Sequence, residues 1–196
     1  MLMHVWGGSL VKLISAILLL AACLPSSAAQ ATTPTSAPSA APVKDPVTTG
    51  LRLLLTRSRN NTLGAITAMP ADKFSYKPTP DQMSFAHLVV HIIGFNNGLC
   101  AKAADIAEPK VEEAKESDPK DKLLAAATAS YDFCADALSK MDDSKLSDNI
   151  ELFPGRQGPR ALADLILAGG WADHYAAAAQ YLRLNNLVPP SAQPKK

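Results

Sequence analysis

Three histidines follow the N-terminal apolar segment, and they are the residues whose type and spacing best suit chemistry. His87 and His91 are four positions apart, so on a helix they would project from the same face. His174 lies far along the chain. Histidines on facing helices of a bundle commonly hold a divalent metal such as zinc. The competing interpretation is a solvated or core-rim pair, because no Asp or Glu lies on the 84–98 stripe to complete a ligand set.

Four proline-free windows are the elements that would have to position these side chains. They span 47–69, 81–108, 120–153 and 160–188, and each is long enough for a helix of several turns. Apolar residues recur in each at three- and four-residue spacing, which predicts amphipathic helices. In the last window the expected buried stripe consists of Leu162, Leu165, Gly169, Ala172, Ala176, Gln180 and Leu184.

Composition favours the same architecture. The 196 residues suit one domain with a tail, and the chain is 47% hydrophobic but only 6% aromatic. No alternation of period two is long enough to predict a strand, so an all-α four-helix bundle is expected. The 19 basic and 18 acidic residues leave a net charge of +1, which argues against a nucleic-acid partner.

The N-terminal segment predicts export. Residues 1–22 end in an apolar run that is too short to span a bilayer and is typical of a signal peptide. Leu20–Cys23 resembles a bacterial lipobox, in which Cys23 would be acylated, whereas Ala29–Ala31 offers an ordinary cleavage site. Both routes lead to the periplasm or cell envelope. Contact with the membrane is expected only through the signal peptide or a lipid on Cys23.

The rest of the chain divides by composition. Residues 23–46 are rich in Pro, Ala, Ser and Thr and bury too little apolar area to fold, which predicts a disordered linker. Residues 47–190 form the expected bundle, and 191–196 form a polar tail. In an exported protein, Cys100 and Cys134 would meet oxidising conditions, which favours a disulfide over two buried free thiols and over a nucleophilic role.

Several segments together resemble the DinB-like superfamily over about residues 50–191: Met69–Pro78, Ser84–Ile92, Asp173–Tyr175 and Tyr181–Ser191. The resemblance implies a four-helix bundle of up-down-down-up order, in place of the simple up-and-down order. Many members bind a divalent metal, zinc or nickel, through three histidines, one on the second helix and two in an HxxxH on the last. Some members are thiol-dependent transferases or isomerases, and most have no assigned reaction.

Carried over residue by residue, the resemblance assigns two of the three ligands. His91 matches the ligand on the second helix, and His174 matches the second histidine of the HxxxH. The first histidine of the HxxxH falls at Gly170, which has no side chain to bind a metal. The metal site is therefore degenerate unless His87 supplies the third imidazole.

Two interpretations of function remain open. The first is a binding or structural module of unassigned reaction that has kept the bundle and lost the triad. The alternative is a metal-dependent transferase or hydrolase using His91, His174 and His87, with the metal activating a thiol or water. Export argues against a thiol-dependent transferase, because the family's small thiol cofactors are mainly cytoplasmic. The resemblance also admits a homodimer, and the sequence leaves any small-molecule ligand unidentified.

Overall fold

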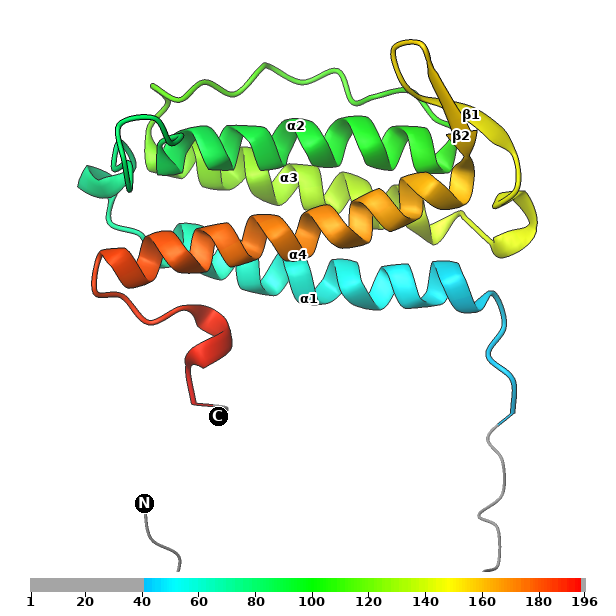
Figure 1. Cartoon of the computed structure of the whole chain (residues 1–196), viewed down its shortest axis with the longest axis horizontal. Coiled ribbons are helices and arrows are strands. Elements are labelled where there is room, and N and C mark those ends of the chain that lie inside the picture. Colours follow the sequence, from blue (N-terminus) through cyan, green and yellow to red (C-terminus); the bar gives the residue numbers. More distant parts are fainter. Residues whose placement is uncertain (1–40, 195–196) are drawn as a thin grey trace, which may run out of the picture. The chain divides into compact units, whose positions relative to one another are not determined.

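The computed structural model describes residues 41–194, so the predicted signal peptide, Cys23 and most of the predicted linker lie outside the described residues. Four helices make up the bundle and are drawn in Figure 1. Their bounds are Pro46–Ala68 for α1, Phe85–Ala104 for α2, Lys120–Ser139 for α3 and Arg160–Leu184 for α4. No helix within residues 41–194 has both the length and the apolar character needed to cross a membrane.

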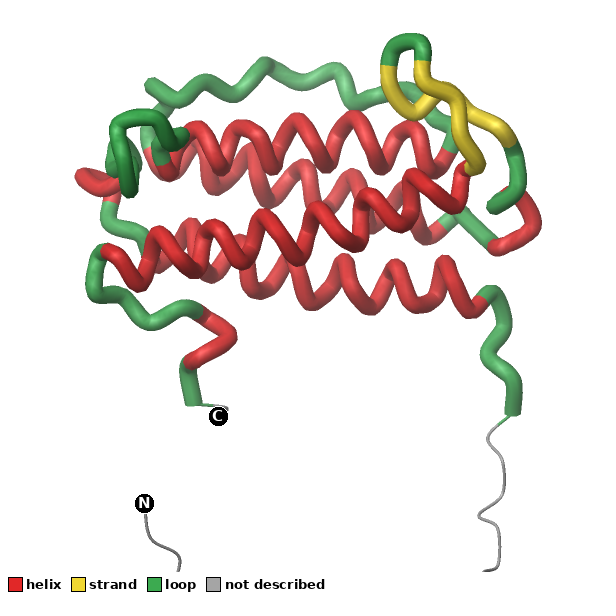
Figure 2. The backbone as a smooth tube through the Cα atoms, in the orientation of Figure 1, coloured by secondary structure: helices red, strands yellow, loops and turns green. Residues whose placement is uncertain are grey.

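The helices follow an up-down-down-up order. In Figure 1, α1 and α4 run in one direction, while α2 and α3 run in the other. The adjacent pairs are α2 with α3, α1 with α4, α2 with α4 and α1 with α3. Because α2 and α3 are parallel, the chain has to return along the bundle between them, and residues 105–119 do so without helix or strand (Figures 1 and 2). The predicted all-α four-helix bundle is confirmed.

A cap at the start of α2 fixes the helix that carries two of the three histidines. The Ser84 hydroxyl accepts a hydrogen bond from the His87 backbone N–H at 2.9 Å, which satisfies one of the free donors of the first turn. The link before it includes a short 3₁₀ helix at Ala71–Lys73, and the backbone N–H groups of Phe85 and Ala86 donate to its Tyr76 and Phe74 carbonyls. Phe74 packs edge-on against Phe85, with ring centroids 5.3 Å apart.

The prediction of the buried face of α4 is wrong, because the predicted stripe is exposed. Leu165 is 67% exposed and Leu162 is 38% exposed. The buried face lies on the other side and includes Leu167, Trp171 and Leu182. Alanines and leucines occur on every side of this helix, so spacing alone could not choose between faces. The face that carries Trp171 is the buried one, since burial of this large aromatic side chain removes the most apolar area from water.

The third window is helical only as far as Ser139, and its remainder is not helix. A 3₁₀ turn at Asp143–Lys145 follows, and then an antiparallel hairpin of β1 (Asn149–Phe153) and β2 (Arg156–Pro159) leads into α4. Figure 2 shows this hairpin at one end of the bundle. Gly155 turns the chain with a positive φ of 71°, a conformation that glycine adopts without strain. Strands this short give no recognisable alternation in the sequence.

A buried polar network ties the four helices to one another. Asn96 on α2 donates to the Ser130 hydroxyl on α3 at 3.1 Å and accepts from the Trp171 indole N–H on α4 at 2.9 Å. Ser58 on α1 shares a 2.9 Å hydrogen bond with the Tyr131 hydroxyl on α3. Because unpaired polar groups are costly in a core, these bonds favour one register of the four helices. A final 3₁₀ turn, Pro190–Ala192, packs on α1.

Candidate functional site

His91 and His174 meet across the cleft between α2 and α4. Their ring centroids are 4.9 Å apart, and the rings are nearly perpendicular, at 89°. His174 is only 7% exposed, whereas His91 is exposed at the cleft surface. The cavity beside them has a volume of about 430 Å³. It is lined by Asp81, Gln82, Met83, Leu88, His91, Asp173, His174, Ala177 and Tyr181.

Phe95 fills the space where a third imidazole would have to stand. A Cβ added to Gly170 would lie 2.8 and 2.9 Å from the two Cε atoms of the Phe95 ring, and closer still to its Cζ. Real Cβ atoms do not approach other atoms so closely. The same ring packs edge-on against His174, with centroids 4.6 Å apart. Glycine at 170 and phenylalanine at 95 are therefore a matched pair, in which the missing side chain on α4 makes room for the ring from α2.

His87 is engaged elsewhere. Its Nδ1 lies 2.6 Å from the Glu116 carboxylate, which belongs to the crossover 105–119. The Ser84 hydroxyl donates to the same carboxylate at 2.8 Å. The hydrogen bond from Ser84, followed by that from His87, lowers the pKa of Glu116 below its ordinary value. This arrangement holds the crossover against the start of α2 and directs His87 toward Glu116.

Burial holds His174 in its neutral form. Desolvation lowers the pKa of His174 to about 4, and the neighbouring His91 adds to the shift while the carboxylate of Asp173 opposes it. The Nδ1 atom of His174 is buried and has no hydrogen-bond partner among residues 41–194. A ligand in the cleft that reached this atom would remove the cost of an unpaired polar group.

A three-histidine metal centre does not fit this arrangement. The third position is occupied by the Phe95 ring, and within the described residues no group of three His, Cys, Asp or Glu side chains is placed to share a metal. Structural and catalytic zinc sites usually need at least three protein ligands. The two imidazoles that do meet can accept or donate hydrogen bonds to a small molecule.

The rim of the cleft is acidic and is held in place by hydrogen bonds. Asp81, on the link before α2, and Asp173, on α4, both line the cavity. The Tyr181 hydroxyl donates to the Met83 carbonyl at 2.6 Å, which ties α4 to that link. Tyr76 also packs edge-on against Tyr181, with centroids 6.3 Å apart. These contacts preform the cleft. The carboxylates of Asp81 and Asp173 favour ligands that carry hydrogen-bond donors or a positive charge.

The two cysteines singled out in the bundle are joined. Cys100 on α2 and Cys134 on α3 form a disulfide, with Cα atoms 5.2 Å apart. Both side chains are fully buried in the core. The bond excludes either sulfur as a free thiolate nucleophile in this state.

Phe95 is the residue of this site that the sequence did not identify. Its place at helical spacing marks it as core, which is also how the other apolar residues of the second window are read. A signal was nevertheless present. If α2 and α4 are antiparallel and His91 faces His174, then the residue one turn after His91 must face the residue one turn before His174. Those residues are Phe95 and Gly170.

Comparison with known proteins gives a consistent result. Residues 54–175 match the family model described as the DinB superfamily. A crystal structure of a DinB-like protein from Bacillus subtilis aligns with a TM-score of 0.61 and 20% identity, covering 75% of this chain and 99% of that one. A DinB-like protein from Bacillus cereus ATCC 10987 aligns with a TM-score of 0.60 and 16% identity, covering 72% and 95%. No curated protein matched.

Proposed function

Since the chain belongs to the DinB superfamily but pairs Gly170 with Phe95, we propose that it is a binding module rather than a three-histidine metalloenzyme. Its ligand would occupy the α2–α4 cleft and accept hydrogen bonds from His91 and His174, or donate hydrogen bonds to them. The acidic rim favours a small ligand with donor groups. The observation that carries the proposal is the Phe95 ring standing where a third imidazole would project.

We also propose that this module works outside the cytoplasm. The sequence supports this through the signal-like segment at residues 1–22. The Cys100–Cys134 disulfide supports it as well, because such bonds persist in oxidising compartments. In that setting the bundle would present its cleft to small molecules of the cell envelope.

A metal-binding measurement tests the proposal. The wild-type chain, without a polyhistidine tag, is dialysed against zinc or nickel, and the metal bound per chain is quantified. We expect no stoichiometric metal. The matched positive control is the double variant Phe95→Ala/Gly170→His, which removes the ring and restores the side chain at 170. This variant should gain about one zinc per chain, since it presents three imidazoles from two facing helices.

Two results would contradict the proposal. One is stoichiometric metal on the wild-type chain that disappears in both His91→Ala and His174→Ala. That result would favour the alternative, a metal-dependent transferase or hydrolase, and His87→Ala would then test His87 as the third ligand. The alternative has one observation in its favour, the direct contact of the His91 and His174 rings. The other contradictory result is a double variant that folds but stays free of metal, because the Phe95–Gly170 pair would then not decide metal binding.

A further inference from the structure

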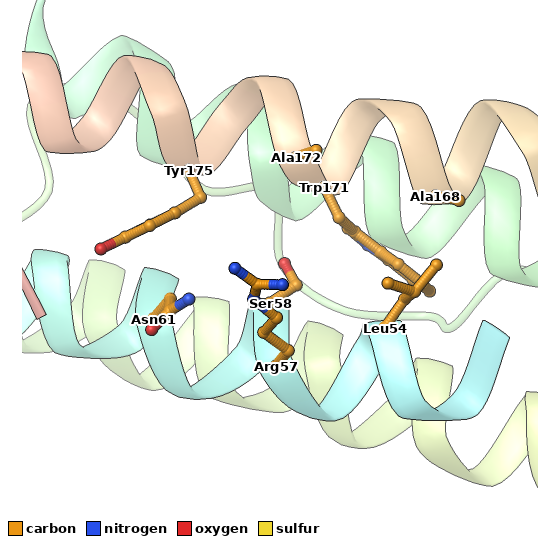
Figure 3. Close-up of a pocket in the computed structure, with 8 residues that line it drawn as sticks. All are labelled: Leu54, Arg57, Ser58, Asn61, Ala168, Trp171, Ala172 and Tyr175. Carbon is orange, nitrogen blue, oxygen red and sulfur yellow. The ribbon is translucent and has the colours of Figure 1, made fainter. Parts of the chain in front are cut away.

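A second groove lies on the other side of α4, between α4 and α1. It has a cavity of about 220 Å³, and Figure 3 shows the eight side chains that line it. The histidine cleft lies between α4 and α2, so the two cavities are separated by α4 itself, and no residue lines both. A cavity of this size is below the range of about 300–1,000 Å³ that holds drug-sized molecules, so its occupant has to be small.

One of the three arginines of α1, Arg57, lines this groove. Arg52 donates to the Leu138 carbonyl at 3.0 Å, near the end of α3. Arg59 forms an ion pair of 2.7 Å with Asp132 on α3. Arg57 has no hydrogen-bond or ion-pair partner among residues 41–194. In the view of Figure 3, its side chain rises from α1 toward α4, and its guanidinium lies between the side chains of Trp171 and Tyr175.

Much of the remaining lining is apolar. Leu54, Ala168 and Ala172 supply aliphatic surface, and Trp171 supplies a ring whose N–H is already bonded to Asn96. Only hydrocarbon from Trp171 is therefore offered to an occupant. These residues lie on α1 and α4, which are packed against each other along their length.

Tyr175 lines the groove and is held by the C-terminal segment. The Tyr175 hydroxyl accepts a hydrogen bond from the Ser191 backbone N–H at 2.8 Å and lies 2.7 Å from the Ser191 hydroxyl. These two bonds fix the Tyr175 ring. Asn61, which also lines the cavity, has an amide group with no hydrogen-bond partner among residues 41–194.

We propose that the α1–α4 groove is a binding site for a small monocarboxylate with a flat apolar body. The guanidinium of Arg57 would pair with the carboxylate, which is the geometry that arginine suits best. The Asn61 amide could donate a further hydrogen bond, and the apolar body would lie against Leu54 and Trp171. A single guanidinium matches a single negative charge, so a monoanion is favoured over a phosphate dianion.

An NMR titration of the full chain with benzoate tests the site. The probe is compared with benzamide, which has nearly the same shape and no charge. Benzoate should shift the indole N–H resonance of Trp171, and benzamide should bind at least about tenfold more weakly because the charge-assisted pair is lost. Arg57→Met should weaken benzoate binding by about tenfold or more. Arg59→Met removes the same charge from the same helix outside the groove, and its affinity should stay within about twofold of wild type.

A second variant tests the cavity without changing charge. Ala172→Leu places extra side-chain volume on an exposed position of α4 that lines the groove, and it should also reduce benzoate binding. The proposal is overturned if benzoate at millimolar concentration does not bind, if the shifts centre on His91 and His174, or if Arg59→Met weakens binding as much as Arg57→Met. It is equally overturned if Ala172→Leu binds as tightly as wild type. Shifts centred on His91 and His174 would place benzoate in the histidine cleft, whereas the other results leave the proposal for that cleft untouched.

Discussion

At the scale of single residues, His174 contributes a cost to folding that depends on pH. Its imidazole is 7% exposed, and burial lowers its pKa to about 4. In the unfolded chain the same group titrates near the ordinary value of about 6.5. A depressed pKa contributes stability that is fully present above the unfolded pKa and is lost as the pH falls through the folded pKa. The window is therefore about pH 6.5 to 4.

We predict that His174→Gln removes this acid sensitivity. The wild-type free energy of unfolding should fall by about 3 kcal/mol relative to the variant between pH 7 and pH 4. Urea denaturation of both chains at several pH values measures the difference, and groups shared by the two chains cancel. Parallel pH profiles would contradict the prediction, as would an NMR titration that places the His174 ring near pH 6.5.

The residues of the site were only partly predictable. His91, His174 and the loss of the third ligand at Gly170 followed from the resemblance. The position of the Phe95 ring in the place of the third ligand could not be predicted, because a phenylalanine at helical spacing is normally counted as core. The role of Phe95 is set by packing between two helices that are distant in sequence. The pairing of His87 with Glu116 was also beyond the sequence, since it depends on the path of the crossover 105–119.

At the scale of elements, the disulfide joins the two parallel helices. Parallel neighbours need a long connection, and residues 105–119 are anchored to the start of α2 through Glu116. The bond between Cys100 and Cys134 closes a loop of 34 residues that includes this crossover. In the chain-entropy account, such a closure restricts the unfolded state and leaves the folded state nearly unchanged.

We predict that Cys100→Ala/Cys134→Ala lowers the free energy of unfolding by about 3–4 kcal/mol, from loop-closure entropy. The helical content should be retained, because Asn96 and the other core contacts of α2 and α3 remain. Urea denaturation followed by circular dichroism measures the change. Wild-type protein held in reductant is the control, and it should lose a similar amount. Equal stability of the two chains would contradict the entropic account.

The elements themselves were predictable to different degrees. Long proline-free windows gave the four helices, because helix formation depends on local spacing and on the absence of proline. The buried face of α4 was predicted wrongly, since its alanines and leucines surround the helix and tertiary contacts choose the face. The hairpin 149–159 was missed because strands of this length carry too little pattern.

At the scale of the whole molecule, α4 has two faces that serve different cavities. The cavity between α4 and α2 is lined by His91 and His174, with Asp81 and Asp173 at its rim. The cavity between α4 and α1 is lined by Arg57 of α1, which has no hydrogen-bond or ion-pair partner among residues 41–194. Trp171 and its partner Asn96 lie between them in the core. If both proposals hold, one bundle would bind ligands of opposite charge character on either side of a single helix.

A lipid anchor for the bundle is a prediction from the residues that precede it. α1 begins at Pro46, and the sequence before it carries the lipobox-like Leu20–Cys23. We predict that the chain, expressed in a bacterial host with its own N-terminus, fractionates with membranes and incorporates radiolabelled palmitate. Cys23→Ser should lose the label and appear in the soluble envelope fraction, because the bundle itself has no membrane-spanning helix within residues 41–194. A wild-type chain without label, whose mature N-terminus follows Ala31, would instead show ordinary signal cleavage. The cleft would then act on soluble ligands of the periplasm, and residues up to 45 would serve as a free tail rather than a tether.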